Sequence, residues 1–228
     1  MDRPSQSEQI VRQRRRQQRS IDTRERILEA ATSEFAEHGY EGASTRNVAI
    51  HAGVRHPLVV YHFKSKEGLW RAVLTSLNER FVKMYQTRLE GLRGVDAPTK
   101  LRLILADFIR FSAENPAFHW LMSHEASKGG RRMNWLVEEY VRSFFKEITD
   151  LIRASQKAGR FVEGDPHHLL YIFVGAVTHL FMLAAEVKKV SGKNPNALPY
   201  IEEHVKLCLG LFFQEPGEPG AHPAAEPR

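Results

Sequence analysis

The sequence predicts an all-α protein with an N-terminal three-helix domain, which contains a helix-turn-helix, and a larger helical C-terminal domain. Three observations lead to this prediction. The segment from Ser44 to Lys66 has the pattern of two short helices joined by a tight turn. Apolar residues recur at helical spacing through most of the remaining chain, and no stretch alternates as a β-strand does. A chain of 228 residues is long enough to bury a sizeable core.

The composition favours a globular protein with a polyanionic partner. Hydrophobic residues make up 42% and charged residues 26% of the chain, and the net charge is +6. Cys208 is the single cysteine, which excludes an intrachain disulfide and fits a reducing cytoplasm. The charged N-terminus lacks the apolar core of a signal peptide. The longest apolar stretch, residues 169–185, is interrupted by Thr178 and His179 and is short for a membrane span. We therefore expect a buried helix there, a cytoplasmic protein and no membrane partner.

The two ends of the chain are expected to be disordered. Residues 1–20 contain six arginines against Asp2 and Glu8, a net charge of +4, and show no apolar period. This basic arm is either a solvated tail or an extension that follows DNA phosphates or the minor groove. Residues 215–228 are rich in proline and glycine and are expected to be unstructured.

Residues 21–65 carry the signals of a three-helix domain. Asp22 and Glu25 have capping-box spacing at the start of the first helix, and Gly39 is expected to end it. The apolar residues expected to pack inward from this helix are Ile27, Leu28, Ala31 and Phe35.

The second and third helices follow closely. Ser44 is expected to cap the second helix, Gly53 to form the turn, and Pro57 to begin the third. The residues expected to complete the core of this domain are Val48, Val59 and Phe63.

Residues 66–214 show the pattern of a second, wholly helical domain. A long helix begins near Lys66, Asp96 and Pro98 open the next, and Asp165-Pro166 opens another that is apolar on most faces. The remaining expected helices cover residues 117–126, 134–158 and 200–213.

The motifs at residues 52–54 and 61–69 resemble one bacterial family. The Ala-Gly-Val turn at 52–54 and the sequence YHFKSKEGL at 61–69, in front of a large helical region, are similar to the TetR family of transcription regulators. This resemblance implies that the third helix enters the DNA major groove and that the protein regulates transcription.

The resemblance also implies which residues meet DNA. Arg46, two residues past the Ser44 cap, could reach a guanine edge or a phosphate. The expected base contacts are Arg46, Arg55, His56, Pro57, Leu58 and Val60. The expected phosphate contacts, which fix register but carry no sequence code, are Ser44, Thr45, Tyr61, His62 and Lys66. His56 could instead be a bystander. Arg55 and Leu58 replace the small polar residue and the threonine usual in the family, so the operator sequence stays open.

The C-terminal domain is expected to form a homodimer and to bind an effector. The resemblance implies that the last two helices of each subunit build a four-helix bundle, although a helix buried within one subunit is an alternative for residues 166–184. It also places a small-molecule pocket in this domain, and an aromatic lining suggests an apolar or aromatic effector. The candidate effector contacts are Phe81, Tyr85, Phe111, Trp120, His124, Trp135 and Phe144.

The sequence contains no motif of a nucleophilic, phosphate-binding or metal-dependent enzyme, so we expect neither catalysis nor a cofactor nor a metal site. The favoured function is a repressor that binds a near-palindromic operator in double-stranded DNA and releases it when the effector binds. The alternative is a helical architectural or chromosome-positioning protein with no small-molecule inducer.

Overall fold

The structure, a computed structural model, describes residues 6–214 of the chain. Within this range the chain is almost wholly helical and forms no strand, apart from one isolated antiparallel bridge between Phe161 and Phe213. The predicted all-α class is confirmed. The chain divides into two compact units. The first extends to Glu79 and also includes Trp120–His124, and the second contains the rest. The boundary expected between residues 65 and 66 therefore falls inside the first unit.

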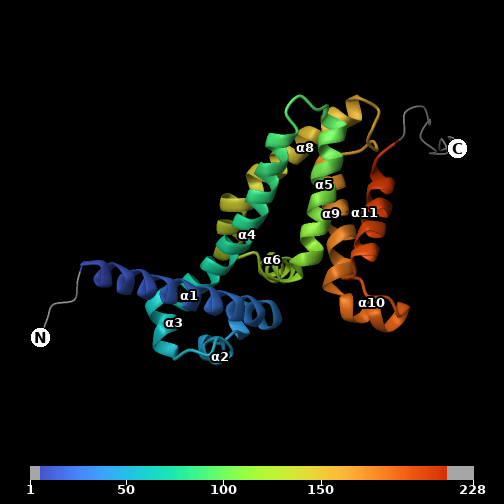
Figure 1. Cartoon of the computed structure of the whole chain (residues 1–228). Coiled ribbons are helices and arrows are strands. Elements are labelled where there is room, and N and C mark those ends of the chain that lie inside the picture. The colour runs from blue at the N-terminus through green and yellow to red at the C-terminus, as the bar shows by residue number, and fades with distance from the viewer. Residues whose placement is uncertain (1–5, 215–228) are drawn as a thin grey trace, which may run out of the picture. The chain divides into compact units, whose positions relative to one another are not determined.

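The first unit is the three-helix domain together with the start of a long fourth helix. Its helices are α1 (Gln6–Gly42), α2 (Thr45–His51), α3 (His56–Phe63) and α4 (Lys66–Gly91), the last of which continues into the second unit (Figure 1). The expected apolar positions are buried, and the first part of α4 adds further side chains to this core. The buried residues include Ile27, Leu28, Ala31, Phe35, Val48, Val59, Phe63, Leu69, Trp70, Val73, Leu74 and Leu77.

The N-terminal arm differs from the expectation. Residues 6–20 are helical and continue α1, so the prediction of disorder over residues 1–20 is wrong for this part. Arginine and glutamine are good helix formers, and no glycine or proline interrupts residues 6–38. Because the packed residues 27–35 already nucleate α1, the helix can extend towards the N-terminus without a second nucleation step. Residues 1–5 and the predicted tail 215–228 lie outside the described residues.

The predicted end of the first helix and the predicted start of the second are confirmed. Gly39 has φ +64° and breaks the helical conformation of α1, as its predicted stop role requires. The side-chain oxygen of Ser44 accepts a hydrogen bond from the Asn47 backbone N–H, as expected of a cap.

The connection from α3 to α4 is a tight turn centred on Lys64. Lys64 has φ +67° and ψ −45°, and the Ser65 N–H donates to the Phe63 carbonyl over 2.7 Å. This is a γ-turn with positive φ, a rare and strained conformation. The same carbonyl lies 2.2 Å from where a side-chain carbon on Gly68 would stand. Only glycine fits at position 68 while this turn is kept.

After α4, whose last part belongs to the second unit, the chain forms seven further helical segments and a short π-helix, all in the second unit except Trp120–His124 of α6. They are α5 (Ala97–Glu114), α6 (Pro116–Lys128), α7 (Arg131–Leu136), the π-helix η1 (Val137–Val141), α8 (Arg142–Lys157), α9 (Pro166–Met182), α10 (Ala184–Ser191) and α11 (Leu198–Phe212). The predicted helix over 134–158 is thus α8 with η1 and part of α7. Asp96 and Asp165 cap α5 and α9, each followed by a proline in the first turn, as predicted.

Helix α5 lies at the centre of the second unit, in contact with α8, α9 and α11 (Figure 1). It is buried over most of its surface, including the polar Ser112, whose hydroxyl donates to the Phe108 carbonyl over 2.7 Å. Around it, α9 contributes Leu170, Phe173, Val177 and Phe181 to the core of its own chain. Of the two readings of residues 166–184, burial within one subunit therefore holds for these four side chains, because α9 packs against α5, α8 and α11 of its own chain.

His119 is a buried polar residue in this aromatic interior. Its ring lies 5.8 Å from that of Phe108 and 5.3 Å from that of Phe118. Its Nε2 atom has no hydrogen-bond partner among the described residues. Burial lowers the pKa of His119 to about 4.

No single helix among residues 6–214 is long and apolar enough to cross a membrane. Helices α9 and α10 meet the length and composition criteria only as a pair, and that pair is bent by 70°. The described part of the chain also holds no group of three potential metal ligands.

The replacement Gly68→Ala should lower the free energy of unfolding by about 1–3 kcal/mol, because the new methyl group must displace the Phe63 carbonyl. Gly91→Ala, at the other end of α4, is the matched control, since an added carbon there meets nothing within 4 Å. Urea unfolding followed by circular dichroism measures both. Equal midpoints for the two variants would contradict the proposed role of Gly68.

The pKa of His119 predicts a pH dependence of stability. Between about pH 6.5 and pH 4 the unfolded chain binds a proton that folded His119 does not, so stability falls as the pH falls through this window. His119→Phe should remove this contribution, which is about 2 kcal/mol at pH 5. Thermal unfolding of the wild type and of His119→Phe from pH 4.5 to 7.5 would show the difference, and parallel pH slopes for the two proteins would contradict this assignment.

Candidate nucleic-acid interface

Two charged side chains of α1 bind the two ends of α2: Glu34 binds its N-terminal end and Arg26 its C-terminal end. At the start of α2, the buried carboxylate of Glu34 accepts hydrogen bonds from the Ser44 N–H over 2.8 Å and from the Asn47 side-chain amide over 3.3 Å. A negative charge at a helix N-terminus is favourable, because the first backbone N–H groups carry partial positive charge.

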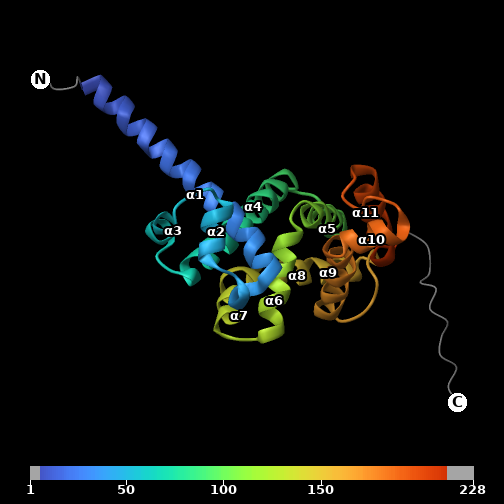
Figure 2. The same ribbon diagram turned by 90° about the horizontal axis from the view of Figure 1, so that it is seen from below.

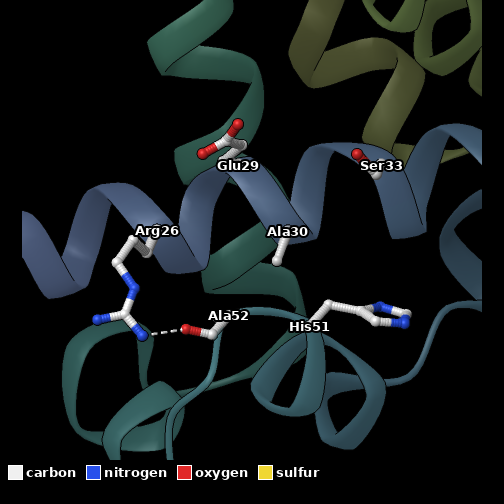
Figure 3. A pocket seen from close by; sticks show the side chains of 6 residues that line it. All are labelled: Arg26, Glu29, Ala30, Ser33, His51 and Ala52. Carbon is white, nitrogen blue, oxygen red and sulfur yellow. Dashed lines mark hydrogen bonds between the residues drawn. The ribbon is translucent and has the colours of Figure 1, made fainter.

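At the opposite end of α2, the guanidinium of Arg26 occupies the turn. Its Nη2 atom donates to the carbonyl of Ala52 (Figure 3) and, over 3.1 Å, to that of Gly53. Ala52 is the C-cap of α2, and its carbonyl is one that a helix C-terminus leaves without a helical partner. Arg26 and Glu34 stand eight residues apart, about 12 Å along α1, which matches the length of the seven-residue α2. The two helices therefore run antiparallel with both ends of α2 fixed.

We call the pair Glu34 and Arg26 the clamp of α2. A groove of about 500 Å³ lies beside this clamp in the first unit. Arg26, Glu29, Ala30 and Ser33 of α1 line one side, and His51 and Ala52 at the end of α2 line the other (Figure 3). His51 Nδ1 lies 3.9 Å from Glu34 Oε2. His51 thus stands behind the turn, beside α1.

Helix α3 presents one face to solvent and one to the core. Val59 and Phe63 are buried, whereas Leu58 and Val60 are 41% and 46% exposed and Tyr61 is 68% exposed. Exposed apolar side chains on a short helix suit contact with thymine methyl groups. Arg55 and Pro57 are also exposed at the start of α3, and Arg46 is exposed on α2. Five of the six residues proposed as base contacts are therefore solvent-accessible.

His56, the sixth, is half-buried and bound within the protein. Its Nε2 atom lies 3.0 Å from the hydroxyl of Thr45, so these two side chains join the start of α3 to the start of α2. This geometry favours the bystander reading of His56 with respect to bases. It also orients the Thr45 hydroxyl, which was expected to meet a phosphate.

The remaining phosphate candidates lie around the exit of α3. The Tyr61 ring has the Lys64 ammonium 5.3 Å above it. Burial, together with the nearby charges of Arg24 and Lys64, lowers the pKa of His62, so this imidazole is biased towards its neutral form. The Lys66 ammonium donates to the Glu41 carbonyl over 3.1 Å and lies 5.0 Å from the Tyr40 ring. Lys66 therefore ties α4 to the end of α1, a structural role that sequence reasoning missed.

The effector candidates do not form a single cluster. Phe81, Phe111, Phe144 and Tyr85 pack together in the second unit, with Phe81 5.1 Å from Phe111 and 4.9 Å from Phe144 between ring centres. Trp135 packs instead against Tyr140, inside the π-helical segment.

Trp120 and His124 belong to the first unit. His124 Nε2 lies 3.2 Å from the Ala36 carbonyl of α1, and its ring lies against Gly39. Sequence periodicity could not separate these residues from the aromatic core, because a helix shared between two units carries one continuous apolar pattern.

The second unit also contains a groove of about 740 Å³ that the sequence did not reveal. Its apolar floor includes Met84, Leu92 and Phe111. Four cationic side chains of α4 and α5 surround it: Arg80, Lys83, Arg88 and Arg110. Asp107 and Glu114 are the acidic residues in this lining.

A solvent-accessible short helix, fixed behind a tight turn in a three-helix unit with a large helical partner unit, defines a helix-turn-helix DNA-binding protein. Residues 27–73 match the family described as "Bacterial regulatory proteins, tetR family", and residues 79–212 match "YcdC-like protein, C-terminal region". The chain belongs to the TetR family and is a DNA-binding transcriptional regulator.

Curated relatives agree with this assignment. The chain is 27% identical over 170 residues to the HTH-type transcriptional regulator RutR of Escherichia coli O157:H7, covering 73% of this chain and 77% of that protein. It is 24% identical over 165 residues to the HTH-type transcriptional regulator YdgC of Bacillus subtilis strain 168, covering 71% and 80%. These relatives are regulators, and the prediction that the chain is not an enzyme is confirmed.

Solved structures show the same fold. HlyIIR, a hemolysin II transcriptional regulator, superposes with a TM-score of 0.62 at 24% identity, covering 86% of this chain and 99% of that chain. A TetR-like transcriptional regulator from Rhodococcus sp. RHA1 has a TM-score of 0.62 at 18% identity, covering 83% and 92%.

Replacing Arg26 with methionine should keep the aliphatic stem but leave two carbonyls of the turn without their charged donor. We expect a loss of about 1.5–3 kcal/mol in the free energy of unfolding and weaker specific DNA binding, because α3 is no longer fixed relative to α2. Arg19→Met, at an exposed position on the same helix, should leave stability unchanged. Chemical denaturation of the free protein separates the two, and equal midpoints would show that the clamp does not stabilise the turn.

Proposed function

We propose that two copies of this chain bind a near-palindromic operator as a repressor, and that a small effector bound in the second unit releases it. The observation that carries the DNA-reading part is the exposed face of α3. Leu58, Val60 and Tyr61 are exposed on this face, and Val59 and Phe63 on the opposite face are buried in the core. Apolar side chains exposed to this extent are best explained by a partner surface.

On that face, Leu58 and Val60 are the candidates for reading thymine methyl groups, and Arg46 of α2 and Arg55 at the start of α3 are the candidates for reading guanine. Ser44, Thr45, Tyr61 and His62 surround them and are candidates for positioning the unit on the phosphates. Lys66 remains a phosphate candidate through the donors that its contact with Glu41 leaves available.

The dimer proposal rests on a face of α9 and α11 that their own subunit leaves exposed. Helix α9 exposes Tyr171, Ile172, Gly175, Ala176 and His179, which recur at helical spacing and include two small residues. The neighbouring helix α11 exposes Leu207 and Leu211, which are 62% and 69% accessible, on either side of Gly210. Two such helices from each subunit would pack as a four-helix bundle, with the small residues allowing close approach.

The effector proposal rests on the groove between α4 and α5. An apolar or aromatic body would cover Met84, Leu92 and Phe111, and an anionic group would meet Arg80 and Lys83. The other two cations are engaged: Arg88 holds Asp107, and Arg110 donates to both carboxylate oxygens of Glu202 over 2.7 and 2.8 Å. An aromatic carboxylate suits this combination of apolar and cationic side chains.

A ligand in this groove would act on a helix that both units share. Arg88 of α4 donates to Asp107 of α5 over 2.9 Å, and Arg110 links α5 to α11. An anion in the groove that competes with Asp107 and Glu202 for Arg88 and Arg110 would shift α4. The first turn of α4 follows α3 through the turn at Lys64. By linkage, the effector lowers operator affinity only by its preference for the non-binding arrangement.

The DNA-reading proposal is tested by selecting duplexes from a random pool and measuring Arg46→Ala on the preferred site. Loss of a bidentate guanine contact should weaken binding by about 1–3 kcal/mol and relax the preference at one position in each half-site. Arg93→Ala, which removes the same charge from the loop before α5, is the control. Sedimentation should give two chains per duplex. An unchanged preferred sequence would overturn the role of Arg46, and a stable monomer at micromolar concentration would overturn the dimer.

The effector proposal is tested with matched pairs of small aromatic carboxylic acids and their uncharged amides. An acid that binds the groove should raise the unfolding temperature by mass action and weaken operator binding, whereas its amide should do neither. Lys83→Gln should reduce both responses. Acids that stabilise the protein without affecting operator affinity would contradict the allosteric link. The absence of any active compound, together with many scattered genomic sites, would favour an architectural protein.

A further inference from the structure

The N-terminal part of α1 continues as a helix beyond the three-helix core. Figure 2 shows this segment extending past α2 and α3, which pack against the later part of α1. Arg12, Arg14, Arg15 and Arg19 are all exposed on it. The DNA-reading role proposed for α3 does not use this segment.

Three of these arginines form a stripe. At 100° per residue, Arg12, Arg15 and Arg19 point within about 60° of one another, and Arg14 points to the other side of the helix. The stripe continues in line to Arg26, which binds the carbonyls of Ala52 and Gly53 in the turn before α3. The arginines are therefore aligned with the side of α1 that carries the turn leading into the proposed reading helix.

A partner of opposite charge would stabilise this part of α1 further. Arginines at spacings of three and four residues repel one another, and the described side chains of residues 12–15 and 17–20 are polar and exposed. A polar helical segment with no packed face is marginal in water. A row of phosphates would neutralise the stripe and stabilise the helix together.

We propose that residues 6–20 of α1 form a phosphate-tracking helix that lies along the backbone of DNA beside the half-site read by α3. The stripe from Arg12 to Arg19 spans about 10 Å, with cations about one helical turn apart, so that several phosphates come within reach. Backbone contacts carry no base code, so this segment would add affinity and length of footprint without adding sequence preference. The proposal rests on the DNA-reading role of α3.

The experiment compares two triple variants with the same change in net charge. The stripe variant is Arg12→Gln, Arg15→Gln and Arg19→Gln. The control changes the other side of the same segment, with Gln13→Glu, Arg14→Gln and Gln17→Glu, all at exposed positions. Binding of the full chain is measured against salt concentration on two duplexes, one ending at the operator and one with ten further base pairs of unrelated sequence on each side.

The wild type should bind the longer duplex more tightly, whatever the flanking sequence, and the stripe variant should lose this gain. If each arginine neutralises one phosphate, the slope of log K against log[salt] should fall by about 2.7 per subunit in the stripe variant, and by clearly less in the control. Both variants should keep the preferred operator sequence, and their circular dichroism should gain helicity on DNA only where the stripe is intact.

Three results would overturn the proposal while leaving the reading role of α3 intact. Equal slopes for the two variants would mean that only net charge matters. A gain that requires A·T-rich flanks would place the segment in the minor groove rather than on the phosphates. Equal wild-type affinity for the two duplexes would show that the arm does not reach the flanks. Failure of the wild type to select any sequence would instead contradict the proposed function itself.

Discussion

The arrangement of the first unit depends on the two charged side chains with which α1 holds α2. Glu34 accepts from the Ser44 N–H at the beginning of α2, and Arg26 donates to the Ala52 carbonyl at its end, so one backbone group at each end of this short helix is bound from one neighbouring helix. A seven-residue helix cannot be stable alone. Held at both ends, it gives the following turn one conformation and α3 one direction. The exposed face of α3 is useful for recognition only because this direction is fixed.

The exit of α3 is fixed by backbone rather than by charge. The turn at Lys64 places the Phe63 carbonyl against the Cα of Gly68, in the first turn of α4. No side chain lies between the end of α3 and the first turn of α4 at this point. A movement of α4 is therefore expected to move α3 as well. Farther along, Arg88 connects α4 to Asp107 of α5, and Arg110 connects α5 to Glu202 of α11. These ion pairs join the proposed effector groove to a helix of the proposed dimer face.

The charged side chains of the first unit fall into two groups, those that bind the protein's own backbone and those that are exposed near the proposed DNA-binding surface. Glu34 and Arg26 bind backbone groups at the two ends of α2 and determine geometry. Arg46 and Arg55 are exposed near the reading helix, and the stripe on the extension of α1 is exposed farther out. Reading and anchoring can therefore be changed separately, since bases and phosphates would be met by different arginines on different helices.

The sequence by itself determined the helical class, the helix-turn-helix, its family and the inward residues of α1 to α3, because capping residues, glycines, prolines and the helical apolar period act locally. It also determined the starts of α5 and α9, which Asp-Pro signals fix. The tertiary structure decided what depends on neighbours distant in the sequence. Glu34 and Arg26 read as ordinary charged positions of α1 until α2 is seen against them, and only the structure shows that Lys66 also ties α4 to Glu41 and Tyr40. Apolarity places Phe173 and Val177 of α9 at a contact, but only the position of α5 shows that this contact lies within one subunit. The helical extension at residues 6–20 follows the same reasoning, since its composition predicts disorder and its continuity with a packed helix gives it structure.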